Sequence, residues 1–234
     1  MDFLSGQILL VDKPLDWTSF DVVNKIRNTI KKKLDIRKIK VGHAGTLDPK
    51  ATGLLIIMTG KFTKRIEEVQ NLSKVYTGVV KVGASRPSFD LETEIDADFP
   101  VEHINDDLIR KIIQSQFKGE IQQLPPMFSA VKIGGRRLYE SARRGIQVER
   151  APRTVQIKQF DFEFDGVDEI SFEIECSKGT YIRSIAHDLG QALESGAYLQ
   201  SLRRTAIGEY HIAKAKSIDE WIHIINSDAI EPSR

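Results

Sequence analysis

Residues 54–58 form an uninterrupted apolar run, Leu-Leu-Ile-Ile-Met, directly after a loop at residues 42–53 that is rich in glycine and threonine. A short apolar run bounded by turn residues is typical of a strand buried on both faces. The loop carries Asp48 followed by Pro49, and a proline restricts the backbone of the residue before it. The sequence therefore predicts a carboxylate held in a turn against the core, either as a functional group or as an Asx-type brace.

Strand and helix patterns alternate through the rest of the chain, and no internal repeat appears. Period-two patterns and β-branched residues predict strands at residues 7–11, 74–82, 119–124, 155–164, 170–176, 198–204 and 207–212. Capping signals and the 3.6-residue period predict helices that begin after Thr18, Asn105, Gly179 and Ser217, and shorter ones at residues 63–71 and 136–145. Turns are expected at residues 12–17 and at 133–135.

The net charge of +1 conceals a strong segregation of charge along the chain. Residues 24–40 contain eight basic side chains and one acid, and residues 132–153 contain seven basic side chains and two acids. Residues 90–107 contain eight acids and no lysine or arginine. Two basic stripes on a nearly neutral protein indicate a groove for a polyanion, although such runs also occur as solvated faces.

Several protein classes are excluded by composition and spacing. The single cysteine, Cys176, rules out an internal disulfide and a cysteine metal cluster, and it reads as a small core residue. No apolar run approaches the ~20 residues that cross a bilayer, and the N-terminus lacks a secretory signal pattern. Residues 59–64 resemble a P-loop but lack its first glycine and its Ser or Thr. A cytoplasmic protein is expected.

Individual polar residues remain open between two roles. Lys13 lies beside a proline turn and is either structural or in contact with substrate, while Lys64 is either a surface charge or a ligand for an anion. Tyr76 lies within a strand, where most tyrosines only contribute to the core. Arg183, at the start of a helix, is a natural partner for a buried carboxylate because its guanidinium keeps an acid ionised. His187 on the same helix is expected to be structural.

Taken together, five segments resemble one family, the TruB-type tRNA pseudouridine synthases. The resemblance is carried by LVDKP with Thr18-Ser19 near the N-terminus, GHAGTLDP and TGLL around Asp48, KVY at residues 74–76, LPPMFSAVK at residues 124–132, and GTYIRS at residues 179–184. These motifs cover nearly the whole chain, in the order that the family has them.

The resemblance implies a role for each of a set of residues. Asp48 would be the catalytic carboxylate, Tyr76 would stack on the target uracil, and Arg183 would pair with Asp48. Tyr181 and Leu202 would line the pocket, and His43 would fill the space vacated by a flipped base. Further contacts with RNA are expected from these side chains: Lys13, Lys64, Lys132, Arg136 and Arg143.

The resemblance also implies a fold, an activity and partners. The expected fold is α+β, with a mixed, mostly antiparallel sheet, flanking helices and a central RNA cleft. One catalytic domain would cover residues 1–234, with a basic insertion at residues 125–153 and no C-terminal PUA domain. The expected activity is isomerisation of uridine 55 in the TΨC loop of tRNA by a monomer, with no metal and no organic or nucleotide cofactor. A non-catalytic RNA chaperone and a purely structural protein are the alternatives.

Overall fold

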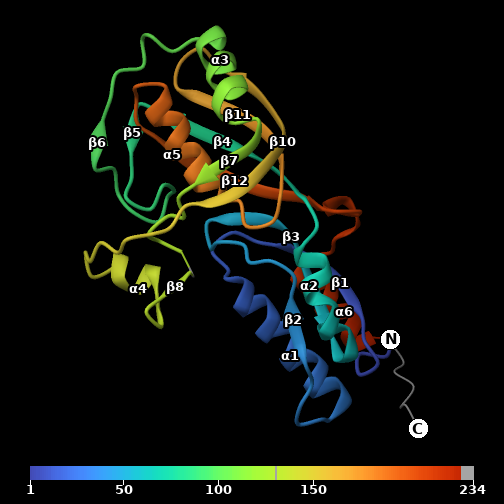
Figure 1. Cartoon of the computed structure of the whole chain (residues 1–234). Helices are drawn as coiled ribbons and strands as arrows, with labels where there is room; N and C mark the ends of the chain where they lie inside the picture. Colours follow the sequence, from blue (N-terminus) through green and yellow to red (C-terminus); the bar gives the residue numbers. More distant parts are fainter. Residues whose placement is uncertain (130, 228–234) are drawn as a thin grey trace. The chain divides into compact units, whose positions relative to one another are not determined.

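The computed structural model describes residues 1–129 and 131–227, apart from the side chains of Lys132, Arg136 and Arg137. The chain divides into two compact units, one comprising Met1–Val75 and Arg203–Arg234 and the other comprising Tyr76–Leu202. Helices and strands mix in both units, as the predicted α+β class requires (Figure 1). None of the helices in the described ranges combines the length and the hydrophobicity needed to span a bilayer.

Strand β3 (Ala51–Thr59) is the central strand of the first unit. It pairs with β1 (Ile8–Lys13) and with β2 (Val41–His43), both antiparallel, and it neighbours β12 (Ala197–Ile207) in the sheet order. The predicted loop at residues 42–53 is therefore shorter than expected, because β2 reaches His43 and β3 starts at Ala51. The turn predicted at residues 12–17 also starts later, since β1 extends to Lys13 opposite Gly53.

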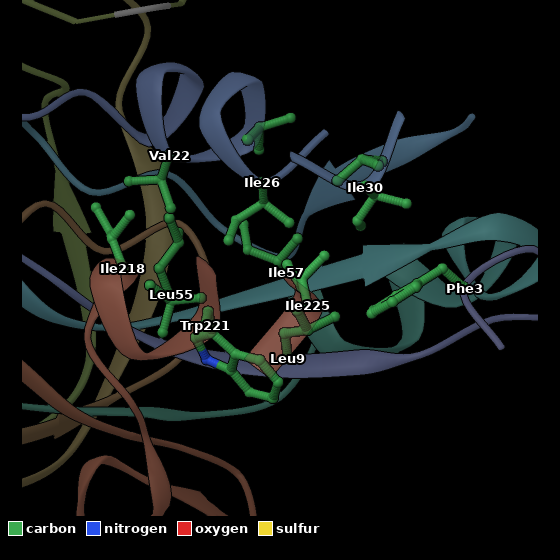
Figure 2. Close-up of a cluster of buried hydrophobic side chains, with 13 residues drawn as sticks. Phe3, Leu9, Val22, Ile26, Ile30, Leu55, Ile57, Ile218, Trp221 and Ile225 are labelled. Carbon is green, nitrogen blue, oxygen red and sulfur yellow. The ribbon is translucent and has the colours of Figure 1, made fainter. Parts of the chain in front are cut away.

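The apolar run at residues 54–58 is buried on both faces, as predicted, and alternation sends its side chains into two clusters. Leu55 and Ile57 contact α1 (Ser19–Leu34) and α6 (Ile218–Ser227) in one cluster, which Figure 2 shows together with Trp221 and Phe3. On the other face, residues Leu54, Ile56 and Met58 belong to a second cluster. The strand after the Asp48 loop is thus among the least exposed parts of the chain.

The long helices of the first unit begin where the sequence predicts. Thr18 caps α1, and its capping box with Asp21 is complete. Ser217 and Glu220 make the reciprocal bonds of a second capping box at the start of α6. The short helix predicted at residues 63–71 is instead a 3-10 helix, η1 (Gly60–Arg65), followed by α2 (Ile66–Gln70).

The main sheet in the second unit has the strand order β12-β4-β11-β10-β7. Their bounds are Lys74–Val82 for β4, Gly119–Gln123 for β7, Arg153–Phe164 for β10 and Glu169–Cys176 for β11. Strand β10 pairs antiparallel with β11 and with β7. The longer helices of the second unit are α3 (Asp106–Gln116), which Asn105 caps, and α5 (Ile182–Ala192). These elements match the predicted ones within a few residues.

Short hairpins account for most of the remaining differences. Gly134 and Gly135 both have positive φ and turn the chain so that β9 (Arg136–Arg137) pairs with β8 (Lys132–Ile133), and helix α4 is limited to Leu138–Ala142. A second small hairpin joins β5 (Ala84–Ser85) to β6 (Ala97–Asp98). The strand predicted at residues 207–212 is also shorter: Ile207 ends β12, and β13 is only Tyr210–His211, followed by the 3-10 helix η2 (Ile212–Lys214).

Candidate functional site

The Asp48 loop connects β2 to β3 and is fixed by hydrogen bonds at both ends. The amide of Ala44 donates to the carbonyl of Ile56 at 2.9 Å, and the amide of Ala51 donates to the carbonyl of Asp48 at 3.1 Å. Between them Leu47 is buried, and both of its backbone groups bond to the Ser19 hydroxyl at 2.9 and 3.1 Å. A side chain from the start of α1 thus fixes the residue directly before Asp48, which is itself half-buried.

The segment before α1 fixes the other side of the same loop. The amide of Asp16 donates to the carbonyl of Pro49 at 2.9 Å, and the Asp16 carboxylate accepts from Lys50 at 2.8 Å. Asp16 adopts a left-handed backbone conformation with φ of 62°. The residues on both sides of Asp48 are therefore bonded to Asp16 and to Ser19, the first residue of α1.

The sequence analysis did not identify Arg204, a residue of β12 whose side chain contacts the Asp48 loop. Its side chain is 1 % exposed and donates three hydrogen bonds to backbone carbonyls: Nε to Leu54 at 2.8 Å, Nη2 to Gly45 at 3.0 Å and Nη1 to Thr46 at 3.3 Å. A buried guanidinium is costly unless its donors find acceptors, and here two carbonyls of the loop and one of β3 accept from it. In the sequence, the one indication of this role is an arginine within a strand predicted to be apolar or alternating at residues 198–204. Its hydrogen-bond partners are 150 or more residues away in the chain, so no local pattern shows them.

Lys13 and His43 complete the surroundings of the loop in the first unit. Lys13 is fully buried, and its ammonium donates to the carbonyls of Pro14 at 2.8 Å and Trp17 at 2.6 Å, which supports its structural reading. Burial lowers the pKa of Lys13 to about 8, against the opposing attraction of the Asp48 carboxylate. Burial, and then the charge of Arg204, lowers the pKa of His43. The loop therefore has an imidazole of lowered pKa and two buried basic side chains, Lys13 and Arg204, in its electrostatic environment.

The second unit carries the predicted residues Tyr76, Tyr181, Arg183 and Leu202. Tyr76 is 8 % exposed on β4, and Leu202 is half-buried on β12. Tyr181 is the N-cap residue of α5, and the guanidinium of Arg153 lies 5.8 Å from the centre of its ring. Arg183, in the first turn of α5, is 3 % exposed. Because Asp48 belongs to the first unit, its pairing with Arg183 stays a prediction.

Within its own unit, Arg183 has a carboxylate partner that sequence analysis did not identify. Its Nε lies 3.6 Å from Oδ2 of Asp90, and its Nη1 donates to the carbonyl of Ser88 at 3.2 Å. Phe89, the residue between Ser88 and Asp90, has a φ of 64°. Its ring stacks on that of His187, with the ring centroids 3.8 Å apart. His187 thus has the structural contact expected of it, and it anchors the turn that presents Asp90.

The remaining predicted RNA contacts lie outside these two groups. Lys64 is exposed on η1. Arg143 is exposed after α4, where it pairs with Glu92 at 2.8 Å and lies 5.5 Å from the Tyr139 ring. The side chains of Lys132 and Arg136 fall outside the described part of the structure.

Comparison with known proteins gives two adjoining family matches. Residues 31–182 match the TruB family pseudouridylate synthase N-terminal domain, and residues 183–226 match the tRNA pseudouridylate synthase B C-terminal domain. A protein of Flavobacterium johnsoniae called tRNA pseudouridine synthase B is 53 % identical over 218 residues, which are 93 % of this chain and 95 % of that protein.

Solved structures agree on the fold. A Cbf5-Nop10-Gar1 complex contains a chain with a TM-score of 0.68 and 29 % identity, matched over 98 % of this chain and 58 % of that one. An H/ACA RNP bound to a substrate RNA containing 2′-deoxyuridine gives a TM-score of 0.65 and 26 % identity over 94 % and 53 % of the two chains. This chain thus spans a little more than half the length of those structures. From the family matches and the close relative together, it belongs to the TruB family of pseudouridylate synthases.

Proposed function

We propose that this protein is a tRNA pseudouridine synthase that isomerises uridine 55 of the TΨC loop. The observation that carries the proposal is that Asp48 lies in a loop fixed by hydrogen bonds, in a chain that belongs to this family. The carboxylate follows a buried residue clamped by Ser19, and the loop before it is held by the guanidinium of Arg204. A polyanion-binding surface gains nothing from such an acid, whereas a reaction at C1′ of a nucleoside does.

The reaction is an isomerisation, so no atom is gained or lost overall. The N1–C1′ bond breaks, the uracil ring turns, and a C5–C1′ bond forms, while the proton on C5 is released and N1 takes one up. Asp48 acts on C1′ as the carboxylate, either by attack or by stabilising the separated sugar. Both roles use the carboxylate form, and in the proposal the guanidinium of Arg183 pairs with it and orients it. Tyr76 stacks on the uracil during the turn.

The uridine reaches this site by leaving its stack in the RNA loop, which costs a few kcal/mol. In the proposal, Tyr181 and Leu202 line the pocket and His43 fills the space that the base leaves. The ammonium of Lys13 contributes an electrostatic attraction to the Asp48 carboxylate. The basic segments at residues 24–40 and 132–153, with Lys64, Lys132, Arg136 and Arg143, contact the RNA backbone and fix its register.

We also propose the finer features of the substrate and its enzyme. The T-arm alone contains the groups that are recognised, so an isolated T-arm hairpin is a substrate. The two units act together as one catalytic domain with a basic insertion at residues 125–153. The enzyme works as a monomer in the cytoplasm, and the chemistry uses only the side chains named above.

The proposal is tested with unmodified tRNA and T-arm hairpin RNA that carry tritium at C5 of uracil. Wild-type protein should release tritium from both RNAs. Asp48→Asn should release none, while retaining RNA affinity within about threefold, because the substitution keeps the shape of the side chain and removes its charge. Asp98→Asn is a matched control, since Asp98 is an exposed acid on β6 and lies outside both basic segments.

Two results would contradict the proposal. Tritium release by Asp48→Asn at the wild-type rate would remove Asp48 from the chemistry. Binding of T-arm RNA by wild-type protein without any tritium release would favour the non-catalytic chaperone.

A further inference from the structure

Gln123 makes an unusual two-point contact with the backbone of a single residue. It is the last residue of β7, and its side chain is 1 % exposed. Its Oε1 accepts from the amide of Tyr181 at 2.7 Å, and its Nε2 donates to the carbonyl of Tyr181 at 3.0 Å. One buried amide thus satisfies both backbone groups of a residue 58 positions away, much as a neighbouring strand would.

The residue that Gln123 binds is the start of α5. Tyr181 is the N-cap of this helix and has no side-chain capping bond of its own. Its carbonyl already accepts from the amide of Ile185 at 3.2 Å, so Gln123 supplies a second donor to the same oxygen. A further bond runs from the Ser184 hydroxyl of α5 to the carbonyl of Leu124, the residue after β7, at 2.8 Å. The first turn of α5 is therefore positioned by the end of β7.

The face of Tyr181 is contacted from the same strand pair. Arg153 of β10 is the direct cross-strand partner of Gln123, and its guanidinium lies 5.8 Å from the Tyr181 ring centre. Gln123 holds the backbone of Tyr181 while Arg153 lies over its ring. Arg183 follows two residues later with its side chain buried against Asp90. A shift of the helix start would move Tyr181 and Arg183 together.

We infer that Gln123 is a positioning residue for the isomerisation, acting through the backbone of Tyr181 to set where Tyr181 and Arg183 meet the substrate. This inference rests on the proposed function. In this inference Gln123 acts through its bonds to Tyr181 and not by binding the substrate. Its effect is to fix the N-terminus of α5, because a displacement of about 1 Å in a positioned group can cost about 100-fold in rate.

The test is a single-turnover measurement of pseudouridine formation with saturating enzyme and T-arm RNA. Gln123→Met removes both bonds and keeps the length of the side chain. Gln123→Glu keeps the acceptor for the Tyr181 amide and loses the donor to its carbonyl. We expect the rate constant to fall at least tenfold for both variants, because a buried Glu oxygen would face the carbonyl of Tyr181, with full reaction amplitude and RNA affinity within twofold. Gln122→Met is the matched control, because Gln122 is the exposed neighbour and bonds only to Thr154 among the described side chains.

A merely structural role for Gln123 predicts a different result. It would lower the melting temperature and the folded fraction measured by circular dichroism, while the rate constant at saturating folded protein stayed at the wild-type value. That result in Gln123→Met, or in Gln123→Glu if the Met variant fails to fold, overturns the inference. Absence of turnover in the wild-type protein would instead overturn the proposed function, so the two failures are distinct.

Discussion

Arg183 lies with its Nε 3.6 Å from the carboxylate of Asp90, and the two side chains are only 4 % and 6 % exposed. A buried ion pair contributes little net stability, but the loss of one partner leaves a buried charge uncompensated. The same guanidinium donates to the carbonyl of Ser88 at 3.2 Å. The turn at residues 88–90 is therefore a fixed support for the arginine that we propose to act in the site.

Asp90→Ala should destabilise the protein by about 3–5 kcal/mol and lower the single-turnover rate at least tenfold, because Arg183 is left buried without this partner. Asp90→Asn should cost less, since the amide oxygen can still accept from the Glu92 amide, as Oδ1 of Asp90 does at 2.9 Å. Urea unfolding and tritium release measure the two effects. Asp98→Ala, at an exposed acid on β6, is the control. Wild-type stability in Asp90→Ala would contradict the buried pairing.

Arg204→Met should cost at least 3 kcal/mol of unfolding free energy and strongly lower pseudouridine formation. It leaves the carbonyls of Gly45, Thr46 and Leu54 without their donor, and each unsatisfied buried group costs about 1–3 kcal/mol. Arg204→Lys should recover only part of the lost stability and activity. Its ammonium keeps the charge and can donate to some of the three carbonyl oxygens, but it reaches fewer of them than the guanidinium does.

The adjacent arginine gives a matched control for Arg204. Arg203 pairs with Asp12 at 2.6 Å, and both side chains are more than a third exposed. Exposed pairs contribute about 0–1 kcal/mol, so Arg203→Met should change stability by no more than that. Equal losses in the two variants would show that Arg204 has no special role in holding the loop.

Lys13 predicts a specific dependence of stability on pH. Its pKa is about 8 in the folded protein, against 10.5 for an ordinary lysine. Between these values the unfolded chain binds more protons, so stability rises with pH there, whereas below pH ~8 the full cost of burying the charge is present. The unfolding free energy of wild type relative to Lys13→Met should therefore increase from pH 8 to 10, by up to about 1.4 kcal/mol per pH unit.

Urea unfolding at several pH values measures this difference. Lys61→Met removes a lysine that is exposed, and it controls for the loss of one positive charge. A difference between wild type and Lys13→Met that is flat or falls over pH 8–10 would contradict the assignment.

Local sequence signals predicted the parts of the fold that depend on neighbours in the chain. The capping box of Thr18 and Asp21 and the apolar run before Thr59 are complete within a few residues, and both are confirmed by the structure. Arg204 and Asp90 were missed because their roles come from partners far away in the chain, which no local pattern encodes. Gln123 was missed for the same reason. In the sequence it is only a polar residue at the end of a strand, and its role appears when the fold places Tyr181 against its side-chain amide.

The strand that follows Asp48 has no alternation of polar and apolar residues, so hydrophobicity cannot decide which of its side chains face which cluster. Its two ends make that choice instead. A Cβ at Gly53 would lie 2.4 Å from the carbonyl oxygen of Arg204, so only glycine fits there. At the other end the buried Thr59 hydroxyl accepts from Gln7 at 3.0 Å and donates to Phe3 at 2.9 Å. Gly53 and Thr59 thus fix the register of β3. A shift of the strand by a single residue would displace the Asp48 carboxylate, although the strand would remain equally apolar.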